Sequence, residues 1–70
     1  MKYSYGDKVT LENLGEYVVM DVCNYEDKNY MALIKISQSE MIMVEVKTED
    51  NLIILSDQDL IKNIVNKMMN

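Results

Sequence analysis

Few side chains in this sequence could carry out catalysis: one thiol and two pairs of carboxylates. A nucleophilic thiol needs a base such as His beside it, and the sequence contains no His. Cys23 falls in a predicted strand, where a buried or half-buried thiol is ordinary. Glu26-Asp27 and Glu49-Asp50 fall at predicted hairpin turns, whereas a general acid needs a carboxyl group in an apolar cleft. We therefore expect no catalytic residue and no enzymatic activity.

Metal and cofactor sites also lack their usual ligands. Zinc sites need clustered Cys or His, and calcium loops need oxygen ligands at fixed spacing around a Gly. The acidic turns do not have that spacing, and Gly6 and Gly15 lie too far apart for a phosphate-binding loop. We expect neither a metal nor a cofactor.

The charge balance is acidic, with 7 Lys against 12 Asp and Glu and a net charge of −5. The sequence has no Arg, which is the side chain best suited to bidentate contacts with phosphates and bases. The negative charge also opposes nonspecific binding to nucleic acids and anionic membranes. We therefore expect no direct binding to nucleic acid.

Three features favour a cytoplasmic location without membrane contact. The single Cys cannot form an intramolecular disulfide, which fits a reducing compartment. The first ten residues, MKYSYGDKVT, contain no apolar run, so we expect no signal peptide. The longest unbroken runs of aliphatic residues and Met are far shorter than the roughly 20 apolar residues of a membrane span.

Alternating apolar and polar residues, enriched in β-branched types, predict strands in the first 55 residues. The connections between them are short, so neighbouring strands should be antiparallel and should follow one another as a meander. The predicted strands cover residues 8–12, 16–24, 30–37, 41–48 and 52–55.

Two of the turns, at residues 26–29 and 48–51, end in Asn after polar residues. Asn tolerates the left-handed conformation, which predicts a type I turn followed by a bulge. The segment from Glu12 to Gly15 is a third candidate, with Gly15 in the left-handed place. This turn type places the apolar residues on one face, with the predicted pairs Asn24 with Ala32, Val22 with Ile34, Met20 with Ile36, and Val46 with Ile54.

After Ser56 the apolar period becomes helical, which predicts an amphipathic helix over residues 57–69. Ser56 can cap it, with Asp59 as a capping-box partner. We therefore predict a single α+β domain over residues 1–70. Its expected architecture is an antiparallel β-meander of four to five strands with one C-terminal amphipathic helix packed on one face. That face should hold the even-numbered apolar residues, such as Val22, Ile34 and Val44.

The odd-numbered face of the predicted sheet is more apolar than a solvated face should be. One helix covers one face, so the other needs the N-terminal segment, with Tyr3 and Tyr5, or a second chain. Exposed apolar patches commonly mark interaction sites. We predict a partner or homodimer surface there, to be tested with Met43→Glu and Leu33→Lys. The candidate partner-binding residues are Tyr17, Val19, Met31, Leu33, Met41 and Met43.

The stretch GEYVVMDVCNYEDKNYMALIKIS resembles short bacterial proteins of a family known as a domain of unknown function. The resemblance is one of pattern over about residues 8 to 69. A strand ends in Val19 to Asp21, an acidic hairpin follows at Tyr25 to Tyr30, and an amphipathic helix closes the chain. It implies a bacterial origin and the same meander-plus-helix fold, and it brings no activity, cofactor or binding residue.

Two functions remain open. The first is a small non-enzymatic protein that acts through protein–protein contact, with another protein or with a second copy of itself. The alternative is an acidic inhibitor of phage or mobile-element type that mimics nucleic acid. A mimic needs its carboxylates gathered into a stripe, whereas here they are spread along the chain.

Overall fold

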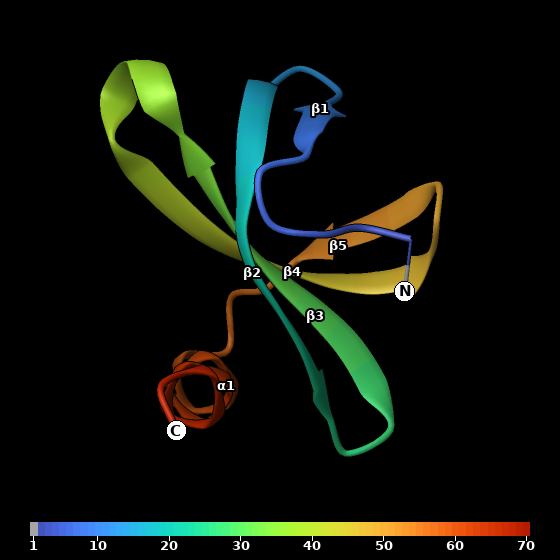
Figure 1. Ribbon diagram of the computed structural model, residues 1–70, viewed down its shortest axis with the longest axis vertical. Helices are drawn as coiled ribbons and strands as arrows, with labels where there is room; N and C mark the ends of the chain where they lie inside the picture. Colours follow the sequence, from blue (N-terminus) through green and yellow to red (C-terminus); the bar gives the residue numbers. More distant parts are fainter. Residues whose placement is uncertain (1) are drawn as a thin grey trace.

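The computed structural model describes residues 2–70, which form a five-stranded antiparallel sheet and one α-helix (Figure 1). The strands follow chain order across the sheet, β1-β2-β3-β4-β5. This arrangement confirms the predicted α+β class and the β-meander. The elements are β1 Lys8–Leu11, β2 Gly15–Tyr25, β3 Lys28–Lys35, a 3-10 helix Ile36–Gln38, β4 Glu40–Thr48, β5 Asn51–Ile54 and α1 Gln58–Met68.

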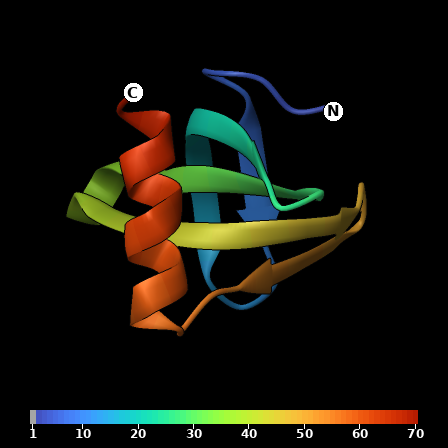
Figure 2. The same ribbon diagram turned by 90° about the horizontal axis from the view of Figure 1, so that it is seen from below.

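The sheet is curled (Figures 1 and 2). Each of its faces buries its own cluster of side chains. The inner face, inside the curl, buries Val9, Tyr17, Val19, Met31, Leu33 and Val44. The outer face buries a smaller cluster together with α1, formed by Cys23, Tyr30, Ala32, Met43 and Ile64. The curl lets the sheet bury most of one face against itself, so α1 is needed only on the other.

The β2–β3 hairpin closes through a two-residue turn, Glu26-Asp27, rather than through a bulged turn with Asn29 left-handed. Glu26 and Asp27 have φ of 51° and 65°, as the central residues of a type I′ turn do. Tyr25 therefore pairs with Lys28, and Asn24 pairs with Asn29. The Asn24 Nδ2 atom donates a hydrogen bond to Asn29 Oδ1 at 3.0 Å, across this pair. The predicted pairing of Asn24 with Ala32 is wrong.

A bulge at Met20 moves the register of β2 once more. Val19 pairs with Leu33 and Asp21 with Ala32, so Met20 has no partner of its own. An extra residue reverses which side chains face inward. Tyr17 and Val19 therefore point to the inner face before the bulge, and Val22 points there after it. The predicted pairs Val22 with Ile34 and Met20 with Ile36 are wrong for the same reason, since Val22 pairs with Met31.

The β4–β5 and β1–β2 hairpins differ less from expectation. In the β4–β5 hairpin, Val46 pairs with Leu52 rather than with the predicted Ile54, and a bulge lies between Val46 and Thr48. A shift of two residues keeps each side chain on its face, because the period of a strand is two. In the β1–β2 hairpin, Gly15 has φ of +102°, as predicted for the left-handed residue of that turn.

The helix α1 begins one residue later than predicted and has a different cap. The Asp57 side chain accepts hydrogen bonds from the backbone N–H groups of Asp59 and Leu60, at 3.1 and 3.2 Å, so Asp57 and not Ser56 is the N-cap. Ile64 is fully buried in the outer cluster. The helix therefore lies over Cys23, Ala32 and their neighbours (Figure 2). The expectation that it covers Val22, Ile34 and Val44 is wrong for Val22 and Val44, which face the inner cluster. Ile34 lies on the same face of β3 as Ala32, which packs against α1.

The N-terminal segment crosses the open side of the curled sheet, from the β4–β5 turn to β1 (Figure 1). Tyr3 packs against the inner cluster, and its hydroxyl donates a hydrogen bond to the Glu49 carbonyl oxygen at 2.5 Å. Gly6 N–H donates to the Val19 carbonyl oxygen and Val19 N–H donates to that of Asp7, both at 2.8 Å. Tyr3 therefore covers part of the inner face, whereas Tyr5 is exposed.

Candidate functional site

The residues predicted to bind a partner lie mostly inside the protein. Among the six, only Met41 is exposed, at 64% of its side-chain and backbone surface. The predicted surface is wrong for the other five because the curl of the sheet and α1 bury them. Leu33→Lys and Met43→Glu would place a charge in a core, so neither variant would report on dimerisation. The five buried residues are Tyr17, Val19, Met31, Leu33 and Met43.

The structure exposes a different set of apolar residues on the outer face, beside α1. Val18 pairs with Ile34, and Ile34 pairs with Met41, so these side chains form a row across β2, β3 and β4. Val18 and Ile34 are half-buried. Ile36, just after β3, lines a hollow together with Val18 and is 70% exposed. Met20, at the bulge, is 39% exposed. We call these five residues the outer apolar patch: Val18, Met20, Ile34, Ile36 and Met41.

A groove continues the outer apolar patch between the sheet and α1. It begins at Met41 and has a volume of about 280 Å³. None of its lining residues is charged, although 19 of the 70 residues of the chain are Asp, Glu or Lys (7 plus 12). The lining residues are Met41, Ile42, Met43, Ile54, Leu55, Gln58, Ile61 and Val65. The patch and the groove share Met41, so they form one apolar surface.

The sequence pattern alone does not reveal this surface. Val18 pairs with Ile34 only when both the Glu26-Asp27 turn and the Met20 bulge are in place, and Met41 joins them through the register of β3 and β4. With the predicted register, Val18 and Ile34 would lie beneath the helix. The one signal that the sequence offers is Met41, which was predicted as a contact residue and is exposed.

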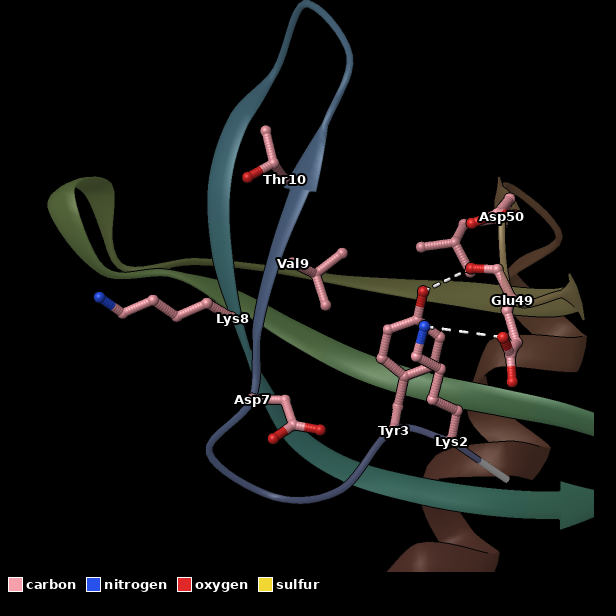
Figure 3. Close-up of a pocket in the computed structure, with 9 residues that line it drawn as sticks. Lys2, Tyr3, Asp7, Lys8, Val9, Thr10, Glu49 and Asp50 are labelled. Carbon is pink, nitrogen blue, oxygen red and sulfur yellow. Dashed lines mark hydrogen bonds and ion pairs between the residues drawn. The ribbon is translucent and has the colours of Figure 1, made fainter.

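A second hollow lies between the edge strands β1 and β5 (Figure 3). It has two adjoining parts of about 490 and 350 Å³, and Thr10, Asp50 and Leu52 line both. Val9 and Leu52 bring the inner cluster to its wall. We call this hollow the β1–β5 cleft. Among residues 2–70 no ladder joins β1 to β5, so the sheet is open along this cleft.

The rim of the β1–β5 cleft is acidic. Its carboxylates belong to Asp7, Glu12, Glu49 and Asp50. Lys2 pairs with Glu49, with 3.6 Å between Nζ and Oε2, and both side chains are largely solvated. Lys8 also lines the cleft, but its side chain points away from β5 (Figure 3). Negative charge therefore exceeds positive charge at this opening.

The buried groups Cys23 and Tyr30 line neither surface. Cys23 is buried in the outer cluster, and its Sγ atom donates a weak hydrogen bond to the Asn24 carbonyl oxygen at 3.6 Å. Burial in the same cluster raises the pKa of Tyr30, and the Glu45 carboxylate raises it further. Within residues 2–70, no three His, Cys, Asp or Glu side chains are grouped so that they could hold a metal ion.

We compared the chain with known proteins. No protein-family model, curated protein or solved structure matches this chain. In the part of the chain that the structure describes, no helix is long and apolar enough to cross a membrane.

Proposed function

We propose that this chain is a non-enzymatic protein that acts by binding another protein through the outer apolar patch and the adjoining groove. One observation carries the proposal. Three strands present a row of apolar side chains, Val18, Ile34 and Met41, that no part of residues 2–70 covers fully. Leaving such a contiguous patch in water is unfavourable, and patches of this kind mark interaction sites in soluble proteins.

The chemistry of the surface indicates the chemistry of the partner. The groove has no charged lining, and Met41 and Met43 are flexible side chains that adapt to apolar groups of different shapes. A partner segment with apolar side chains on one face, such as an amphipathic helix, would fill such a groove. The two most exposed residues of the surface, Met41 and Ile36, would lose the most contact with water.

Affinity capture from a lysate of the source organism, compared across surface variants, tests this function. Met41→Lys and Ile36→Lys change exposed side chains, so folding should be nearly unaffected. Met69→Lys is the matched control, because Met69 is 79% exposed near the end of α1 and does not line the groove. Light scattering on the purified chain tells whether the partner is a second copy.

We expect that one protein is captured by the parent and by Met69→Lys, and that Met41→Lys and Ile36→Lys lose it. If the chain binds itself, the same two variants should be monomeric. A monomeric parent that captures the same proteins as all three variants would rule out this surface.

A further inference from the structure

The β1–β5 cleft supports a second binding mode that differs from contact through the outer apolar patch. The two strands that flank it are the edges of the sheet, and each pairs with a neighbour on one side only. Because every neighbouring pair is antiparallel, β1 and β5 run in the same direction. A single strand lying between them can therefore be antiparallel to both. A strand inserted there would run beside Tyr3, which lines one of the two parts of the cleft. It would close the open sheet into a six-stranded barrel, which removes both edges.

The backbone of both edges is oriented for such a strand. Val19 N–H donates to the Asp7 carbonyl oxygen, and antiparallel ladders alternate, so the backbone groups of Lys8 and Thr10 point away from β2. In the same way, Leu55 N–H donates to the Met43 carbonyl oxygen at 2.9 Å. The backbone groups of Leu52 and Ile54 therefore point away from β4. Both edges thus present donors and acceptors to the cleft.

The side chains of the cleft select the kind of strand. Val9 and Leu52 at its wall favour an apolar side chain that points inward. The carboxylates of Asp7, Glu12 and Asp50 at its rim favour positive side chains that point outward. We propose that the β1–β5 cleft binds an extended segment of a partner protein as a sixth strand, with apolar residues alternating with Lys or Arg.

Nuclear magnetic resonance titration with short peptides tests this proposal directly. The probe is a six-residue peptide that alternates Val and Lys, with both ends blocked. One control peptide alternates Val and Glu. A second control keeps Val and Lys but carries N-methyl groups on alternate backbone nitrogens, which removes donors and keeps charge.

We expect saturable shifts confined to residues 8–11 and 51–54, and slower amide exchange at Lys8, Thr10, Leu52 and Ile54. The N-methylated peptide should bind at least about tenfold more weakly, and the Val-Glu peptide should not bind. The double variant Glu12→Lys and Asp50→Lys should weaken the Val-Lys peptide at least about fivefold at low salt. Thr10→Pro should abolish binding, since it removes an outward donor from an edge strand.

Circular dichroism shows whether the Thr10→Pro variant is folded. If it is unfolded, the double variant Glu12→Lys and Asp50→Lys still tests the proposal. Absence of binding by the Val-Lys peptide would overturn the proposal. Equal binding by the N-methylated peptide, or shifts at Ile34, Ile36 and Met41 instead of the edges, would overturn it too. The surface variants Met41→Lys and Ile36→Lys should leave this binding unchanged, which separates it from the proposed function.

Discussion

The Tyr3 hydroxyl donates a hydrogen bond to the Glu49 carbonyl oxygen at 2.5 Å, and this contact ties the N-terminal segment to the β4–β5 turn across the open side of the curled sheet. The ring of Tyr3 packs on the inner cluster at the same place. The inner core is therefore closed by a segment that forms no strand.

Tyr3→Phe should lower the free energy of unfolding by about 0.5–1.5 kcal/mol, because it removes this hydrogen bond and keeps the ring. Tyr3→Ala should lower it further, since the apolar contact is also lost. Urea unfolding measures both. Tyr5→Phe is the control, because Tyr5 is 75% exposed, and it should leave stability unchanged. Equal stability of the parent and Tyr3→Ala would show that the segment does not close the core.

Ile64→Val should lower the free energy of unfolding by about 0.5–1.5 kcal/mol, because Ile64 is fully buried between α1 and the outer face. The conservative change keeps a small domain folded, whereas Ile64→Ala could unfold it. Met69→Ala, at the exposed end of the helix, should change stability by less than about 0.5 kcal/mol. Thermal unfolding followed by circular dichroism compares them. A helix that is not packed on the sheet would make the two variants alike.

Replacing Glu26-Asp27 with Asn-Gly should stabilise the protein by about 1 kcal/mol. Both residues have positive φ, which side chains other than Gly and Asn adopt unfavourably. The same replacement at Glu49-Asp50 is the matched control. Those residues do not have positive φ, so Gly there should lower stability by about 0.5–1 kcal/mol through the entropy of the unfolded chain. Stabilisation at both turns, or at Glu49-Asp50 alone, would contradict the turn assignment.

Asp57→Ala should lower stability by about 1 kcal/mol, because the Asp57 carboxylate caps two N–H groups of α1. Ser56→Ala should have little effect, since Ser56 is not the cap. Urea unfolding at neutral pH distinguishes them. A larger loss with Ser56→Ala would restore the cap that the sequence pattern favours.

Stability should fall as the pH rises above about 10, with Tyr30 as one cause. Its pKa is raised above the ordinary value of 10.0 by burial and then by Glu45. The unfolded chain therefore loses the Tyr30 proton at lower pH than the folded chain. The contribution of Tyr30 to the free energy of unfolding is fully present below pH 10.0 and is lost as the pH rises above it.

Urea unfolding between about pH 9 and pH 11 measures this slope. Tyr30→Phe should flatten it, and Tyr5→Phe should not, because Tyr5 is exposed. Equal slopes in the parent and Tyr30→Phe would show that Tyr30 does not couple folding to pH.

Much of the architecture follows from local pattern. The predicted strand over residues 41–48 is observed as Glu40–Thr48, and the predicted helix over residues 57–69 is observed as Gln58–Met68. Period-two and helical spacing involve only residues close together in the sequence. Strands and helices can therefore be predicted from them without knowing the rest of the fold. The short connections also fixed the antiparallel order of the meander.

The candidate surface was not predictable in the same way. The turn at Glu26-Asp27 and the bulge at Met20, neither of which was predicted, put Val22 on the inner face. The pairing of β3 with β4 puts Val44 there as well. Both faces of β3 are apolar, since Met31 and Leu33 point inward and Ala32 and Ile34 outward. Pattern therefore could not choose between registers that differ by one residue.

The sequence by itself determined which segments are strands and which segment is the helix. Only the tertiary structure decided which apolar residues are buried. Residues 46 positions apart, Tyr3 and Glu49, close the core through a contact that no local pattern encodes. Which side chains are buried depends on the register of every pair of neighbouring strands. One extra residue at Met20 is enough to turn the side chains that follow it in β2 to the opposite face of the sheet.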